Sequence, residues 1–539
     1  MQCKIDDLPD ELLEYILSLV PPYKTLESCK FVCKRWRRTT EVVIARNEAH
    51  FQRSVAVGSL LWYSLPSIHG PPTIGKRHSH SACIYDNSMY VFGGCTSTWT
   101  TFNDLWQLDL DTRTWMRPIT MGSYPSPKAC ATMLYYQKNF ILFGGWSYPV
   151  PYPLHQQRRL FNELHIYSIE SNKWTAIDTL LTPPPMSAHS ASIHGNTMVV
   201  FGGVCDGESS NDVWCFNLDS YRWYKRNINI TLGNVFPEPR YGQSQIELGE
   251  KHLLILGGCT GPNTPMNDAW LLKMEGAIWM WKKVTMRHTE WAPTRIWCDQ
   301  ACKVGNYVIV LSKNKRQTKP NDMSISLKKT ACQRSTSPRS ESSPLHGRSG
   351  NLSTPDRDEN VNGRHGAFSR SHLQNACTSS HAPNISKVIS VYNDNSLSMA
   401  AFRDQRSHSN LNTIRERRLE SVRRMEEKIK RPQTKISKKI DSIEKNAQAI
   451  ASKKTENTLS IFVLDITKVL DDCSASWIPF KQDNYSGPDE RILYSLVAGK
   501  GELIVFGGIC RQQMTIHRNS LNDEVYNDLH FISPPRYDI

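Results

Sequence analysis

The sequence has no long hydrophobic run, although it is 539 residues long. No apolar stretch approaches the roughly 18 residues of a membrane span, and no N-terminal segment joins a basic stretch, an apolar core and a small-residue cleavage site. The 15 cysteines include no pairs at the two-residue spacing that zinc knuckles use. We therefore expect a soluble chain of the cytoplasm and/or nucleus, with reduced cysteines and with no cofactor, metal or membrane partner.

Acidic residues are fewer than basic residues in only one part of the chain, the segment from residue 313 to residue 457. Residues 313–457 hold 29 Lys and Arg against 14 Asp and Glu, which leaves 36 against 37 of the chain's 65 and 51 for all other residues. The formal net charge of +14 therefore belongs to that segment. A basic surface over the whole chain would favour nucleic acid as a partner. One basic strip in a neutral chain argues against nucleic acid and favours a local contact or a targeting signal.

The first 40 residues have the period of helices. Pro21-Pro22 ends a first run of apolar residues at helical spacing, which contains Leu12, Leu13, Ile16, Leu17 and Leu19. A second helical pattern extends from Leu26 to Trp36. A segment this short rarely builds a stable core alone. Apolar side chains that remain exposed on its helices are therefore candidates for an interface.

Two patterns in this segment carry a resemblance. They are Leu8-Pro9-x-Glu11-Leu12-Leu13-x-x-Ile16-Leu17 and Val32-Cys33-Lys34-x-Trp36. Residues 1–47 resemble an F-box, the helical module by which substrate receptors bind the Skp adaptor of cullin-based ubiquitin ligases. The resemblance implies an adaptor-binding set of Leu8, Pro9, Leu12, Leu13, Ile16, Leu17, Val32, Cys33 and Trp36. The alternative is an ordinary helical hairpin packed on the next domain.

A different unit repeats from residue 60 onward. Each copy has an apolar run that ends in two glycines, then Asn with an acidic residue, then an alternating strand-like run and a tryptophan, as in residues 90–115. The glycine pairs begin at residues 93, 144, 202, 257 and 507, and the closing tryptophans are residues 115, 174, 223, 281 and 477. Periods near 50 residues indicate a propeller rather than separate domains.

This unit resembles the kelch repeat, in which four antiparallel strands form one propeller blade. Paired glycines suit a sharp backbone turn or a close approach, and a late tryptophan suits the space between neighbouring blades. The fold class we predict is mostly β: a six-bladed kelch β-propeller with a small all-α F-box before it and a long disordered or helical insertion.

The wide gap between the fourth and fifth glycine pairs predicts a split blade. Tyr307–Leu311 and Leu459–Leu464 read as its second and third strands, with Ser312-Lys313 in place of two glycines. Residues 313–457 are then an insertion, too polar to fold up to about residue 410 and basic with helical spacing from 413 to 454. That helical part is either a docking helix pair or a solvated spacer. Residues 458–533 complete the fifth and sixth blades.

The sixth blade lacks a tryptophan of its own. Leu61-Trp62-Tyr63 precedes a proline and a basic residue, as the other closing tryptophans do. We predict that residues 60–66 supply the outer strand of the last blade, so that residues 60–312 contain four blades, half of the fifth and this closing strand.

Strand direction also predicts a substrate face. The insertion and the residues that begin each first strand open on one face, and the F-box lies on the other. In several kelch propellers this face binds peptide substrates, and basic residues near these positions contact acidic partners. The resemblance thus implies a substrate-binding set of Arg77, His78, Lys128, Arg240, Arg295 and Arg491.

Three functions compete at this point. The first is a non-catalytic substrate receptor of a Skp–cullin–F-box ubiquitin ligase, in which the propeller selects a protein substrate. The second is a copper oxidase of the galactose oxidase type, but no Tyr/His set at a suitable spacing supports it. The third is a kelch scaffold that binds cytoskeleton or nucleic acid through the basic insertion.

Overall fold

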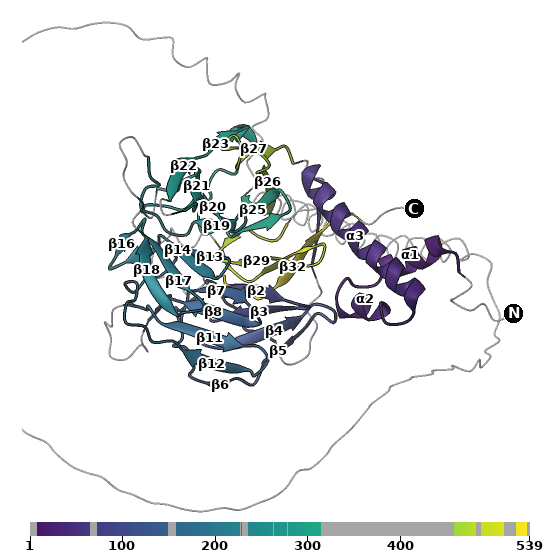
Figure 1. Ribbon diagram of the computed structural model, residues 1–539, viewed down its shortest axis with the longest axis horizontal. Coiled ribbons are helices and arrows are strands. Elements are labelled where there is room, and N and C mark those ends of the chain that lie inside the picture. The colour runs from purple at the N-terminus through teal and green to yellow at the C-terminus, as the bar shows by residue number, and fades with distance from the viewer. Residues whose placement is uncertain are drawn as a thin grey trace, which may run out of the picture. The chain divides into compact units, whose positions relative to one another are not determined.

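The computed structural model describes residues 8–64, 73–148, 158–226, 228, 235–261, 264–276, 279–313, 458–480, 487–510 and 524–535. Three helices are followed by sheets of antiparallel strands (Figure 1). The predicted insertion, with its helical pattern from 413 to 454, lies outside the described residues, apart from its first residue.

The helical module consists of α1 (Asp10–Ser18), α2 (Lys24–Cys29) and α3 (Lys34–Ala56). Pro9 precedes α1 with an extended backbone, which its ring favours and which a helix start tolerates. Leu13, Leu17, Leu26 and Val43 form the small buried core of the module. The third helix continues to Ala56, beyond the predicted boundary at residue 47, because Phe51 and Val55 pack into the propeller core.

The propeller has six blades, each an antiparallel sheet of four strands. Blades 1 to 3 contain β2 (Ser81–Tyr85), β3 (Ser88–Phe92), β4 (Leu105–Asp109) and β5 (Thr114–Met116); β7 (Thr132–Tyr136), β8 (Asn139–Phe143), β11 (Leu164–Ser168) and β12 (Lys173–Ala176); and β13 (Ser190–His194), β14 (Thr197–Phe201), β17 (Val213–Asn217) and β18 (Arg222–Arg226).

Blades 4 to 6 contain β19 (Ser244–Glu247), β20 (His252–Leu256), β21 (Ala269–Lys273) and β22 (Met280–Lys283); β24 (Ala301–Val304), β25 (Tyr307–Lys313), β26 (Leu459–Asp465) and β27 (Ser474–Ile478); and β29 (Ser495–Ala498), β30 (Leu503–Phe506), β32 (Leu529–Ser533) and β1 (Leu61–Ser64). Parallel edge strands β6 (Met121–Gly122) and β23 (Thr285–Arg287) extend blades 2 and 5, and η2 (Thr289–Trp291) follows β23. Short ribbons pair β9 (Trp146–Ser147) with β10 (Arg159–Leu160), β15 (Val204–Cys205) with β16 (Glu208–Ser209), and β28 (Arg491–Ile492) with β31 (Ile509–Cys510).

The first strand after the helices closes the ring, as the position of Trp62 predicts. β1 pairs antiparallel with β32, so that Trp62 lies opposite Ile532 across some 470 residues of chain. Inner strands contact one another in sequence around the ring, and β29 contacts β2 to complete it (Figure 1). Closure in this way pairs two strand edges that would otherwise be exposed.

A ring of backbone hydrogen bonds ties the six blades at their centre. A residue shortly before each inner strand has a positive φ. Its backbone N–H donates to the carbonyl of the matching residue in the preceding blade at 2.8–3.1 Å. The six bonds form a closed cycle through Ser79, Cys130, Ala188, Gly242, Cys298 and Leu493. Backbone hydrogen bonds, which do not depend on the side chain at these positions, thus connect every blade to the preceding one.

The tryptophans of the outer strands fill the spaces between blades. Trp174 of blade 2 packs on Phe92 of blade 1 with ring centroids 5.3 Å apart, and Trp281 of blade 4 packs on Phe201 of blade 3 at 5.1 Å. Trp115 closes the circle by packing on Phe506 of blade 6 at 5.0 Å. This arrangement confirms the role predicted for the repeated tryptophan.

The glycine pairs are required by the same junctions. At the junction of blades 4 and 5, the N–H of Gly258 donates to the carbonyl of Ile296 at 2.8 Å. The preceding Gly257 has φ +67°, and a Cβ on it would lie 2.3 Å from that carbonyl oxygen. A side chain is excluded there by both the dihedral angle and the space.

The split blade keeps its ladder intact. Lys313, the last residue of β25, lies directly opposite Leu459, the first residue of β26. The insertion therefore leaves and re-enters the blade at neighbouring positions. Since the entropic cost of closing a loop grows only slowly with its length, a blade can accept a long insertion at such a point.

Hydrogen bonds and ion pairs hold the helical module to turns of the propeller. The buried carboxylate of Glu502 accepts from the Tyr23 hydroxyl at 2.5 Å, the Tyr63 hydroxyl at 2.6 Å and the Arg113 guanidinium at 2.8 Å. Burial, together with the charge of Glu502, raises the pKa of Tyr23. Thr25 bonds to Asp111 in the turn between β4 and β5. These turns are at the end of the strands opposite to the loops that follow the glycine pairs.

Candidate functional site: an exposed helix face and a ring of basic residues

One face of α1 exposes large apolar side chains. Leu12 and Ile16 are 49% and 38% exposed, and Tyr15 and Leu19 are exposed beside them at helical spacing. In the turn before α3, Phe31 is 81% exposed and Val32 is 61% exposed. These six residues, Leu12, Tyr15, Ile16, Leu19, Phe31 and Val32, are called the α1 face below. Exposed apolar groups in such number on a small module are typical of a binding surface.

The structure divides the nine adaptor residues predicted from the sequence. Leu12, Ile16 and Val32 belong to the α1 face, and Pro9 is exposed at the start of α1. Leu13 and Leu17 are fully buried in the core of the module, and Trp36 packs partly against that core. Leu8 is half-buried, and its carbonyl accepts a hydrogen bond from Arg35. The Cys33 sulfur accepts from the N–H of Trp36 and caps α3.

Sequence reasoning missed three members of the α1 face. Tyr15 and Leu19 continue the spacing of Leu12 and Ile16 by three and four residues. Leu19 stood in the helical pattern of the sequence but was not assigned to the adaptor-binding set, and the same periodicity could have found Tyr15. Phe31 directly precedes the recognised Val32, but it has no periodic partner.

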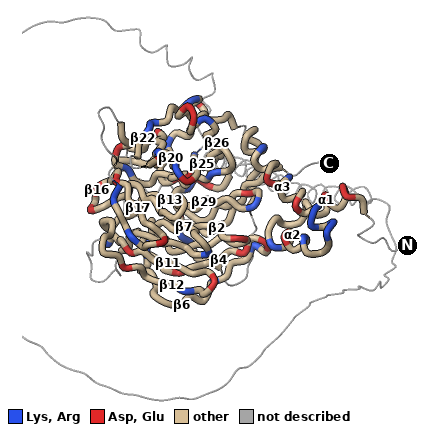
Figure 2. Tube along the Cα trace, in the orientation of Figure 1, with Lys and Arg blue, Asp and Glu red and all other residues tan. Residues whose placement is uncertain are grey.

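Basic side chains gather beside this face. Lys34, Arg35, Arg37 and Arg38 begin α3, where Lys and Arg cluster near α1 and α2 (Figure 2). Arg35 bonds to Asp10 at 2.8 Å and thereby holds the start of α3 to the start of α1. The side chain of Arg38 is 78% exposed. A partner that covers the α1 face would therefore meet positive charge at its rim.

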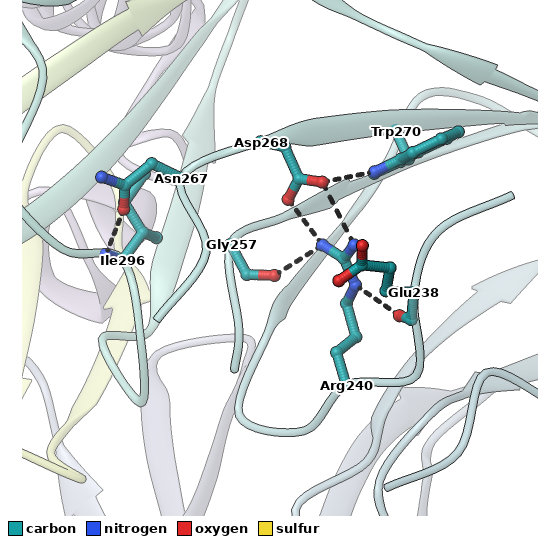
Figure 3. A network of polar contacts seen from close by, with 7 residues as sticks. All are labelled: Glu238, Arg240, Gly257, Asn267, Asp268, Trp270 and Ile296. Atoms are coloured by element: carbon teal, nitrogen blue, oxygen red, sulfur yellow. Dashed lines mark hydrogen bonds and ion pairs between the residues drawn. The ribbon is translucent and has the colours of Figure 1, made fainter. Parts of the chain in front are cut away.

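The predicted substrate residues lie in a different environment from the one expected. Arg240 is fully buried, and its guanidinium donates to both oxygens of Asp268 at 2.7 and 3.1 Å and to the carbonyl of Gly257 at 3.0 Å (Figure 3). Trp270 donates its indole N–H to the same carboxylate at 2.7 Å. Burial alone would raise the pKa of Asp268, but the hydrogen bonds and charge of Arg240 outweigh it and lower the pKa.

The same constellation recurs in other blades. Arg77 pairs with both oxygens of Asp104, Arg491 with both oxygens of Asp528, and Lys128 with Glu163 at 2.7 Å. All three cations are about 1% exposed. His78 is also fully buried, and burial lowers its pKa to about 4, so it is neutral at physiological pH. Each of the four cations is thus paired with a carboxylate of its own blade, and none of the five side chains is exposed for contact with an acidic substrate in this structure.

Arg295 is exposed because it stands one residue out of register. The position that matches Arg240 and Lys128 is Ile296, whose carbonyl accepts from the second glycine of the preceding blade. Blade 3 likewise has an apolar residue there, the buried Met186. A proline three residues earlier marks the true register, as Pro293 does for Ile296 and Pro237 for Arg240. That signal was present in the sequence.

A polar cavity of about 230 Å³ lies where the inner strands begin. All six blades contribute residues to it, including Ser81, Thr132, Ser190, Ser244 and Gln300. Hydroxyl groups of this wall are used between blades: Ser81 donates to the carbonyl of Ala131 at 2.6 Å, and Ser244 to that of Asp299 at 3.1 Å.

Two further findings concern the described part of the chain. It contains no group of three or more His, Cys, Asp or Glu side chains placed to hold a metal ion. None of the helices described there has the length and apolar character to cross a membrane.

Comparisons with known proteins match both parts of the chain. A family model described as "F-box-like" matches residues 5–42, and one described as "FBX42, beta-propeller domain" matches residues 77–279. "Kelch domain-containing protein 1" of Mus musculus is 26% identical over 265 residues, which are 46% of this chain and 63% of that protein.

Two other curated relatives align over a similar length. "Kelch domain-containing protein 3" of Homo sapiens is 27% identical over 270 residues, or 47% of this chain and 66% of that protein. "Kelch domain-containing protein 2" of Bos taurus is 29% identical over 259 residues, or 44% and 61%. The chain thus spans 61–66% of the length of these relatives.

Proposed function

We propose that this chain, an F-box and kelch-repeat protein, is a substrate-recognition subunit of a Skp–cullin–F-box ubiquitin ligase. The observation that carries the proposal is the α1 face. Leu12 and Ile16 are exposed while their neighbours Leu13 and Leu17 are buried, so the helix has one apolar side for its own core and a second without cover among the described residues. The Skp adaptor would bind that second side.

The energetics favour a partner at this face. Covering an apolar side chain the size of Leu or Phe stabilises a complex by roughly 1.5–3 kcal/mol before the costs of association. Six such side chains on the α1 face are therefore enough for a specific interface. The basic start of α3 suggests that the adaptor surface around them is acidic.

The contribution of such a receptor to ubiquitin transfer is proximity. It would hold a protein substrate on the propeller and the ubiquitin-carrying enzyme on the cullin, so that transfer becomes effectively intramolecular. No catalytic side chain of this chain is needed for that step. We place this work in the cytoplasm or nucleus, where the adaptor and cullin act.

The proposal predicts a clean effect of charge on the α1 face. The double variant Leu12→Glu/Ile16→Glu should lose adaptor binding by a factor of about 100 or more, because two carboxylates would be buried against apolar groups. Binding of the full chain to purified Skp adaptor is measured by titration calorimetry. Both side chains are exposed, so the variant should keep the unfolding midpoint of the wild type.

A matched control uses exposed apolar residues elsewhere. Val57 and Ile119 are 72% and 88% exposed, outside the α1 face. Val57→Glu/Ile119→Glu should bind the adaptor like the wild type. Equal affinity of all three proteins for the adaptor, or no binding by the wild type, would refute the proposed function.

A further inference from the structure

Three aromatic side chains meet at the loops of blades 1 and 2 that follow the glycine pairs. Trp146 is buried at the centre, with its ring 5.7 Å from that of Trp99 and 5.4 Å from that of Tyr148. Trp99 and Tyr148 are 39% and 43% exposed, and their rings are 6.3 Å apart. The fully buried ring of His78 supports Trp99 from below at 5.7 Å.

The loop that presents Trp99 is stiff. Trp99 has a positive φ of 63°, which is unusual for a bulky residue and costs conformational energy. Thr96 and Thr100 hold the turn by hydrogen bonds of 3.0 and 3.2 Å between their backbone and hydroxyl groups. Thr101 bonds to Ser147 at 2.8 Å and joins this loop to the loop of blade 2. The rings are thus held in place before any partner arrives.

An arginine borders the rings. The guanidinium of Arg158 lies 4.5 Å from the centroid of Trp146 and donates to the Ser187 hydroxyl at 3.0 Å. Arg159, its exposed neighbour, lies opposite Ser147 on the other face of the short ribbon of β9 and β10, over Phe161 at 5.2 Å. Within the described ranges neither guanidinium forms an ion pair with a carboxylate. They differ in this from Arg77, Arg240 and Arg491, whose charges are paired internally.

We propose that Trp99, Trp146, Tyr148 and Arg158, called the Trp99 patch, bind an acidic peptide segment that carries an apolar or aromatic side chain. The rings accept the apolar side chain, and the guanidinium of Arg158 donates charge-assisted hydrogen bonds to a carboxylate of the peptide. Preorganised Trp, Tyr and Arg are the residue types that dominate interface affinity. The inference rests on the proposed function, since the peptide would belong to the substrate.

Nucleic acid is the competing occupant, because bases also stack on aromatic rings. Binding to nucleic acid, however, needs a track of cations along the phosphates. On this face the cations at the repeated position are buried and paired with Asp104, Asp268, Asp528 and Glu163. A guanidinium beside the rings, such as that of Arg158, suits a single carboxylate better than a phosphate backbone.

The experiment measures binding of the full chain to fluorescent copolymers by anisotropy. A random copolymer of glutamate and tyrosine is the probe, with a lysine–tyrosine copolymer and an oligothymidine strand for comparison. Arg158→Glu and Trp99→Gly, which suits the positive φ, should each weaken binding to the glutamate–tyrosine copolymer by about tenfold or more.

Arg287→Glu and Trp291→Ala are the matched controls, because both residues are exposed at the outer edge of blade 5. They should bind the copolymer like the wild type. Absence of copolymer binding, equal binding by all variants, or preference for the oligothymidine strand or the lysine–tyrosine copolymer would overturn the inference. Adaptor titration of the same proteins separates this result from the proposed function, because the Trp99 patch variants should bind the adaptor normally.

Discussion

At the scale of single residues, a buried arginine in this fold is a structural group. Arg240 makes four hydrogen bonds, to Asp268, Gly257 and Glu238, and each would be lost together with its charge. Blades 3 and 5 have the buried apolar residues Met186 and Ile296 at the same position. An apolar residue there is therefore compatible with the blade, provided that no carboxylate depends on the arginine.

Arg240→Met should destabilise the protein by about 3 kcal/mol, because it fills the space but leaves Asp268 partly buried without its cation. Unfolding by urea measures the change in free energy. Arg295→Met, one blade away and exposed, should change the stability by less than about 0.5 kcal/mol. Equal effects of the two substitutions would contradict the structural role of Arg240.

The arginines also show what sequence reasoning could and could not reach. The spacing of Arg77 and Arg240 relative to the repeat was visible, but the identity of their partners was not. Each basic residue and the acidic residue of its own repeat are 27–37 residues apart and meet only after the blade forms. The contact with acidic partners that is seen in the family was therefore assigned to side chains whose charges are already paired with carboxylates inside the blades.

At the scale of the element, glycine pairs and tryptophans define the blades. Both were predictable, because the tryptophan recurs in every blade, and the glycine pair in every blade but the fifth, at a fixed strand position. The closing strand was predictable for the same reason, since Trp62 stood where a sixth tryptophan was missing. Which apolar residues of α1 face the core and which face the surface was not predictable. The sequence does not say which side of the helix is turned toward the core, so either of two adjacent leucines could be the buried one.

Two glycines of blade 4 separate the two reasons for which a position can require glycine, a positive φ and a close approach of other atoms. Gly257→Ala should destabilise the protein by about 3 kcal/mol or more, because its Cβ would lie 2.3 Å from a carbonyl oxygen and its φ is positive. Gly276 has a similar φ of +63° but no atom within 4 Å of a Cβ. Gly276→Ala should therefore cost only about 1 kcal/mol.

The difference between the stability losses of these two variants is the free-energy cost of the close approach at the blade junction. Thermal or urea unfolding of both proteins measures it. If Gly276→Ala were as damaging as Gly257→Ala, the dihedral angle alone would explain the glycine, and the junction hydrogen bond from Gly258 would lose its importance.

At the scale of the whole molecule, Glu502 joins segments that are distant in sequence. Tyr23 and Tyr63, which donate to it, are 479 and 439 residues away. The carboxylate is 5% exposed and thus connects the helical module, the closing strand and blades 1 and 6. No sequence pattern indicated this residue, since nothing in a repeat specifies which turn a preceding module will contact.

Glu502→Gln should weaken this connection without unfolding the blades. The amide can accept from only some of the three donors and presents an N–H₂ group to the others, so we expect a loss of about 2–3 kcal/mol. Faster hydrogen exchange in α2 and β1, with the inner strands unchanged, is the predicted result. Lys500→Gln removes a 3.7 Å contact with Glu27 and a 3.0 Å hydrogen bond to Asn87 but leaves the three donors to Glu502 in place, so exchange in α2 and β1 should stay as in the wild type.

The proposed function requires that the Skp adaptor bind the α1 face while the propeller remains free for a substrate. Hydrogen exchange of the full chain, with and without purified adaptor, tests it most directly. We predict slower exchange in residues 10–19 and 30–36 on adaptor binding, with the loops around Trp99 and Tyr148 unchanged. Protection of those propeller loops instead of α1, or no protection in either place, would contradict adaptor binding at the α1 face.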